Sequence, residues 1–132
     1  MEEWGNRVVL TRPVVPVSVP ELFAAQVARS PQAVALSCGD VCMTYRELDE
    51  AANRLAHLLV GYGAGPGQYV GLLFRRSAEA VVAMVAVLKS GAAYLAIDPA
   101  LPDARIDFML ADAGRSRCSP PPVWPTGWMA MR

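Results

Sequence analysis

Four glycines around Pro66 are the first candidates for chemistry, because the backbone N–H groups of glycine-rich loops can bind phosphate. They are Gly61, Gly63, Gly65 and Gly67. A nucleotide-binding loop follows a strand and opens a helix, so that its N–H groups meet the phosphates. This cluster instead follows an expected helix and precedes an expected strand. We therefore interpret it as a linker, with nucleotide binding as the alternative.

Arg75 and Arg76 stand at the end of an expected strand and just before an expected helix, a place where α/β proteins often bind anions. Two solvated arginines in a loop are the commoner explanation, and an anion site is the alternative. Together with the glycine cluster, this pair is the only support for one possible function, that of a small nucleotide-binding regulator.

His57 and Asp98 are the remaining polar candidates for catalysis or ligand binding. His57 falls on the side of its expected helix away from the apolar residues, which predicts an exposed, ordinary histidine. No Gly-x-Ser-x-Gly nucleophile motif accompanies it. Asp98 precedes Pro99, and we interpret it as the start of a turn rather than as a ligand-binding carboxylate.

The cysteines do not form a recognisable framework. Cys38, Cys42 and Cys118 are few and odd in number, so we expect no disulfide scaffold and a reducing compartment. A structural zinc site needs four ligands, and His57 is the only histidine that could join them. We expect no metal site.

Length and composition limit the classes of protein. The 132 residues suit one domain, and 54% hydrophobic against 18% charged residues excludes disorder over the whole length. Twelve basic and twelve acidic residues cancel, which removes the charge expected of a nucleic-acid or membrane binder. The first residues lack the basic and apolar pattern of a signal peptide, so we expect none, and residues 80–88 are too short an apolar run to cross a bilayer. These features predict a cytoplasmic protein.

Periodicity and helix caps predict the elements that position these residues. Ser18 and Thr44 each stand three residues before a glutamate, as in a capping box, and Ser77 can cap a further helix. The expected helices are 19–29, 45–62 with Gly63 as the stop, 79–89, and 103–113 with Gly114 as the terminator. The expected strands are 33–38 and 41–43, which form a hairpin, 69–74, which is buried on both faces, and 93–97.

Two helices show an apolar face. The expected buried face of the second helix consists of Leu48, Ala52, Leu55, Leu59 and Tyr62, and that of the last helix consists of Ile106, Met109 and Leu110. The element order contains a strand-helix-strand unit and predicts an α/β fold with a partly parallel sheet covered on both sides. A further strand ought to follow the last helix, and none does. The sheet is left incomplete.

The composition changes at residue 115. Residues 115–132 hold three arginines, no acid, four of the eleven prolines and two of the three tryptophans, without any period. We interpret Trp124 and Trp128 as exposed apolar residues rather than as an aromatic platform. The change is typical of a GC-rich gene read in a shifted frame, and the alternative is a genuine short protein with a divergent tail.

Two stretches carry a family resemblance. Residues 43–48, Met-Thr-Tyr-Arg-Glu-Leu, resemble the first core motif of adenylation domains in nonribosomal peptide synthetases, and residues 88–99 resemble the second. The resemblance runs nearly continuously over 19–114. Residues 3–6 are similar to the linker between a condensation domain and an adenylation domain. Ala96 departs from the second motif, where the family usually has proline.

The resemblance implies an incomplete N-terminal part of the large subdomain of an adenylate-forming enzyme. The intact family activates an amino acid with ATP and magnesium to an aminoacyl-adenylate and loads it on a carrier-protein thiol. The motifs that do this chemistry lie downstream of the second motif, so we assign no catalytic, cofactor-binding or metal-binding residue. Lys89 lies in the second motif and is not the family's catalytic lysine. Carrier protein and condensation domain are the implied partners.

The sequence thus predicts three segments: an interdomain-type linker over 1–18, the N-terminal part of an AMP-binding domain over 19–114, and an irregular tail over 115–132. The preferred function is a truncated adenylation domain that is inactive alone. The alternative is a non-catalytic interaction module that a partner chain completes. An unfinished parallel sheet leaves strands such as 69–74 poorly covered, so we expect a marginally stable, aggregation-prone chain.

Overall fold

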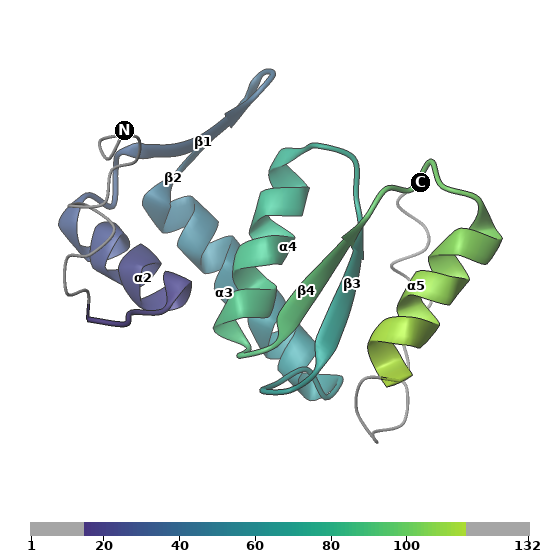
Figure 1. Ribbon diagram of the computed structural model, residues 1–132. Coiled ribbons are helices and arrows are strands. Elements are labelled where there is room, and N and C mark those ends of the chain that lie inside the picture. The colour runs from purple at the N-terminus through teal and green to yellow at the C-terminus, as the bar shows by residue number, and fades with distance from the viewer. Residues whose placement is uncertain (1–14, 116–132) are drawn as a thin grey trace, which may run out of the picture.

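A computed structural model describes residues 15–115, as four helices and four strands in a mixed α/β arrangement. The order is α2 (Val19–Arg29), β1 (Val34–Cys38), β2 (Val41–Thr44), α3 (Tyr45–Gly61), β3 (Tyr69–Leu73), α4 (Ala78–Lys89), β4 (Ala93–Ile97) and α5 (Asp103–Arg115). Figure 1 shows the hairpin β1–β2 above α2, and β3 and β4 between α4 and α5. The predicted element order and α/β class are confirmed.

The helix starts follow from short-range hydrogen bonds, as predicted. The Ser18 hydroxyl accepts from the Glu21 N–H at 3.4 Å, and the Glu21 carboxylate accepts from the Ser18 N–H at 2.7 Å. Thr44 and Glu47 repeat this capping box at the start of α3, with distances of 3.2 and 2.8 Å. Each box satisfies N–H groups that have no partner inside the helix.

The strands form two separate pairs in the described part of the chain, rather than one sheet. β1 and β2 pair antiparallel as a hairpin, and β3 pairs with β4 in parallel, from Tyr69 opposite Ala93 to Leu73 opposite Ile97. A parallel pair needs a crossover helix, and α4 supplies it. The predicted strand-helix-strand unit is therefore present.

The core lies between β3 and the two helices α3 and α4. Val70 and Leu72 of β3 are each 4% exposed and pack with small residues of both helices and with Val87. The sequence predicted burial of β3 on both faces, and this is wrong in part, since Tyr69 and Leu73 are each 40% exposed. Among residues 15–115, the element that covers their face is α5, which approaches at Gly71.

Close packing at Gly71 explains how α5 reaches the sheet. A Cβ atom built on Gly71 would lie 2.6 Å from Cδ2 of Leu110 on α5. The missing side chain therefore leaves room for the helix. Ile106 is buried, and Met109 and Leu110 are half-buried, which confirms the predicted face of α5.

Two helix ends differ from the prediction. α5 continues through Gly114 to Arg115, because a glycine ends a helix when it adopts a positive φ and Gly114 does not. α3 ends at Gly61, so Tyr62 is its C-cap and is 50% exposed instead of lining the buried face. Ala56 is buried on α3 although it was not among the predicted residues, and Leu48, Ala52 and Leu59 are buried as predicted.

Candidate functional site

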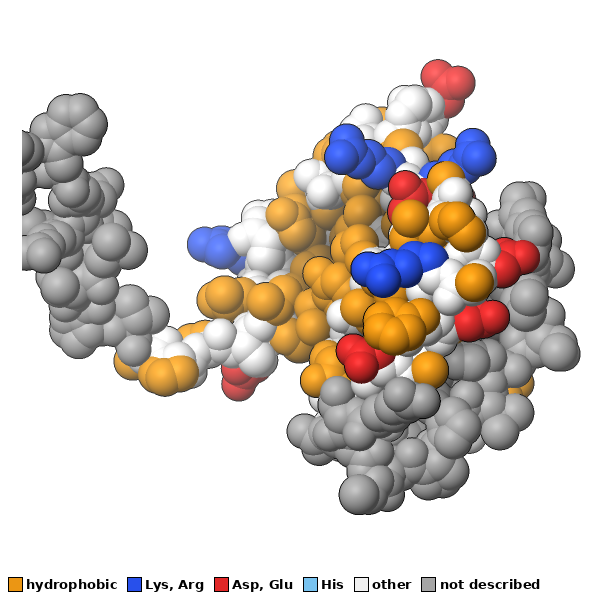
Figure 2. All heavy atoms as spheres, turned by 45° about the vertical axis from the view of Figure 1, so that its right-hand side comes forward, with side chains coloured by type: hydrophobic (Ala, Val, Ile, Leu, Met, Phe, Trp, Pro, Cys, Tyr) orange, Lys and Arg blue, Asp and Glu red, His pale blue; other side chains and the backbone are white. Residues whose placement is uncertain are grey.

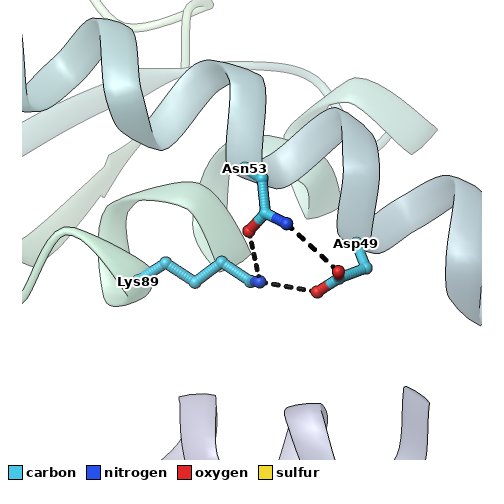
Figure 3. A network of polar contacts seen from close by, with 3 residues as sticks. All are labelled: Asp49, Asn53 and Lys89. Carbon is cyan, nitrogen blue, oxygen red and sulfur yellow. Dashed lines mark hydrogen bonds and ion pairs between the residues drawn. The ribbon is translucent and has the colours of Figure 1, made fainter. Parts of the chain in front are cut away.

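The most connected polar group in the described residues is Lys89, in the last turn of α4. Its Nζ donates to Oδ1 of Asp49 and to Oδ1 of Asn53, each at 2.6 Å (Figure 3). Asn53 in turn donates from Nδ2 to Oδ2 of Asp49 at 3.1 Å, which closes a triangle across α3 and α4. The Lys89 side chain is 17% exposed and that of Asp49 is 23% exposed.

Lys89 also contacts a third helix. Its Nζ lies 5.5 Å from the ring centroid of Phe23 on α2, within the range of a cation–π interaction. The Phe23 ring lies 6.1 Å from the ring of Tyr45 at the start of α3. The ammonium group is thus engaged with α2 and α3, and it also complements the C-terminal end of the α4 dipole. We call Lys89, Asp49, Asn53 and Phe23 the Lys89 cluster.

Sequence analysis missed this cluster. Asp49 and Asn53 lie 40 and 36 residues before Lys89 in the chain, so no local pattern relates them. The available signal was that Lys89, the single lysine of the sequence, follows an uninterrupted apolar run over residues 80–88. The cluster joins α3, which the first core motif opens, to the start of the second motif.

The glycine cluster lies between α3 and β3, as its interpretation as a linker requires. Gly63 and Gly67 have φ values of +95° and +85°, which side chains rarely adopt. The Gly63 N–H donates to the Val60 carbonyl, and the Gly65 carbonyl accepts from the Gln68 N–H. These groups therefore shape a turn in the chain.

The other candidates within the described residues are exposed, and Arg75 and Asp98 follow the neighbouring ends of β3 and β4. Arg75 and Arg76 are exposed between β3 and α4, and His57 is exposed on α3 as predicted. Asp98 accepts from the Ala100 N–H at 2.9 Å, which confirms the turn. Cys38 and Cys42 are exposed free thiols. Cys118, Trp124 and Trp128 lie outside the described residues.

Three glutamates at helix starts have lowered pKa values. The pKa of Glu21 is lowered from its ordinary value of 4.5, first by the Ser18 side chain and then by the Ser18 N–H. The pKa of Glu47 is lowered first by the Thr44 N–H and then by its hydroxyl. For Glu79 the first cause is its own N–H and the second is Ser77. These shifts stabilise helices and do not poise an acid or base for catalysis.

Within residues 15–115, no group of three or more His, Cys, Asp or Glu side chains could hold a metal ion. None of the helices in that range is both long and apolar enough to cross a bilayer.

Comparison with known proteins identifies the family. Residues 23–118 match the family described as AMP-binding enzyme. Isonitrile lipopeptide synthase of Mycobacterium tuberculosis is 68% identical over 114 residues, which are 86% of this chain and 4% of that protein. Dimodular nonribosomal peptide synthase of Bacillus subtilis is 50% identical over 97 residues, 74% of this chain and 4% of that protein.

A solved structure shows the same fold. The nonribosomal peptide synthetase FmoA3, crystallised with alpha-methyl-L-serine-AMP, matches with a TM-score of 0.75 and 36% identity over 79% of this chain and 12% of that chain. The chain belongs to the AMP-binding enzyme family. It corresponds to a fragment of a nonribosomal peptide synthetase adenylation domain and spans only a small part of these relatives.

Proposed function

We propose that this chain is the N-terminal scaffold of an adenylation domain and does not form an adenylate by itself. The observation that carries the proposal is that polar side chains of both motifs form hydrogen bonds within the chain that hold helices in place. Thr44 and Glu47 cap α3, and Lys89 is bound to Asp49 and Asn53. None of the polar or charged residues among those described is buried.

The implied activity belongs to the intact domain. By resemblance, that domain joins an amino acid to ATP, releases pyrophosphate and transfers the aminoacyl group to a carrier-protein thiol, in a synthetase that also holds condensation domains. Magnesium would accompany the ATP. Residues 15–115 contain no cluster of three or more His, Cys, Asp or Glu side chains that could hold the ion, and we assign no step of the reaction to them.

Amino-acid-dependent exchange of pyrophosphate into ATP tests the proposal. The purified chain, assayed with magnesium and pools of amino acids, should show no exchange above a boiled control. A sample of an intact adenylation domain confirms that the assay works. Exchange by the chain that depends on one amino acid and stops with a magnesium chelator would overturn the proposal.

A second candidate function is a non-catalytic interaction module. It is favoured by exposed apolar side chains at the strands, including Tyr69, Leu73, Val34 and Val41 at 40 to 63% exposure. Figure 2 shows hydrophobic side chains gathered between the charged ones on the face where α5 comes forward. This function predicts a chain that is soluble and folded only with its partner. A stable, monodisperse monomer would count against it.

We also propose that residues 115–132 derive from a shifted reading frame, on their composition alone. The nucleotide sequence from the Gly114 codon, translated in all frames, tests this. Another frame that continues into a glycine-rich Ser/Thr loop ending in Lys-Gly is the expected result. If no frame encodes such a loop, the frameshift proposal is wrong and the alternative of a divergent tail is favoured.

A further inference from the structure

One edge of β4 has no strand beside it in residues 15–115. The Ala93 N–H donates to the Gln68 carbonyl at 2.9 Å, on the β3 side. Because successive residues of a strand turn their N–H and C=O groups to opposite sides, those of Tyr94 and Ala96 face away from β3. They form a short row of donors and acceptors along the outer edge.

This edge lacks the usual protection against pairing. Natural edge strands carry charged side chains, prolines or bulges, and Ala93–Ile97 has none of these: its sequence is Ala-Tyr-Leu-Ala-Ile and its register with β3 is continuous. Ala93 and Ala96 are exposed, and Tyr94 is 39% exposed. An uncharged, accessible edge of this kind accepts another strand.

The opposite edge of the pair, on β3, is the one that a following strand would join. α5 follows β4 but packs over β3, where Gly71 makes room for Leu110. A right-handed crossover would carry a strand that follows α5 to the free side of β3. A strand that directly follows α5 would therefore leave the outer edge of β4 unpaired.

We propose that the outer edge of β4 binds the same edge of a second copy of this chain. The two strands would run antiparallel about a two-fold axis at Leu95, so that Tyr94 of each copy lies opposite Ala96 of the other. In that register the outward N–H and C=O groups of each such pair exchange hydrogen bonds. The large Tyr94 ring would cover the small Ala96 side chain, which makes the strand complementary to itself.

The net charge of the chain permits the dimer, and the small buried area makes it weak. Twelve basic and twelve acidic residues give no net repulsion between copies, and the paired segment itself has no charge. Five residues in each strand bury much less than the ~1,200 Å² typical of a stable interface. The dimer is therefore weak and depends on concentration. It does not depend on the adenylation function proposed above.

Sedimentation equilibrium of the full chain over a series of concentrations tests the proposal. The average mass should rise from that of one chain towards that of two. Ala96→Pro removes half of the inter-chain donors without removing a bond to β3, and it should raise the dissociation constant about tenfold or more. Ala96→Ser keeps the N–H group and should dimerise as the original chain does.

Circular dichroism of each variant shows whether the fold is kept. If Ala96→Pro fails to fold, Ala96→Lys provides the second test, because it keeps the N–H group and adds a charge at the edge; it should weaken the dimer. A monomer at every concentration would overturn the proposal. The proposal would also be overturned if folded Ala96→Pro or Ala96→Lys formed a dimer, or a larger aggregate, as readily as the original chain.

Discussion

Replacing Lys89 with methionine tests whether the Lys89 cluster holds the helices together. The change keeps the length of the apolar stem and removes two charge-assisted hydrogen bonds of 2.6 Å and the contact with Phe23. Such bonds are worth about 1.5–3 kcal/mol each when the charge is shielded. Asp49 keeps its bond to Asn53, and both charged side chains are partly exposed, so the loss is smaller than the sum. We expect about 2 kcal/mol.

Urea unfolding followed by circular dichroism measures this loss. Arg76→Met is the matched control, because it removes an exposed charge on the loop before α4 and should change the free energy of unfolding by less than about 0.5 kcal/mol. A cycle with Asp49→Asn should give a coupling of about 1 kcal/mol between the two side chains. A Lys89→Met variant as stable as the control, with no coupling, would refute the reasoning.

Three further predictions concern packing, pH and stability. Gly71→Ala forces Leu110 to move and should lower the free energy of unfolding by about 1–2 kcal/mol. Amide hydrogen exchange in α5 should become faster, and unchanged exchange would contradict the close contact. Since hydrogen bonds lower the pKa of Glu47 below 4.5, its cap stabilises the fold above that pH, and this contribution is lost as pH falls through the lowered value. Glu47→Gln should flatten the decline in the free energy of unfolding below pH 4.5, and an unaltered decline would count against the capping box. The chain should aggregate on mild heating, whereas cooperative unfolding above about 65 °C would show that its open strands are well covered.

The parts of the fold that the sequence predicted depend on neighbours in the chain. Ser18 and Glu21, and likewise Thr44 and Glu47, are three residues apart, so their hydrogen bonds form wherever a helix begins. The Asp98 turn is equally local. The core motifs were visible for the same reason: each is a continuous stretch that caps a helix or joins a helix to a strand.

What the sequence did not predict depends on contacts between distant segments. The Lys89 cluster brings together three helices, and the one-sided burial of β3 depends on where α5 lies. The role of Gly114 was misjudged because glycine permits a positive φ without requiring it. No catalytic group was assigned for a different reason: by resemblance, the motifs that do the family's chemistry lie downstream of residues 88–99.

An exchange of segments tests the central claim most directly. Residues 19–114 would replace the corresponding part of an active adenylation domain from a close relative, and pyrophosphate exchange would be measured over a panel of amino acids. If the segment is a scaffold, the chimera keeps both the activity and the amino-acid preference of its parent. A folded chimera that is inactive, or that prefers another amino acid, would show that the segment carries part of the chemistry or the specificity and would contradict the account.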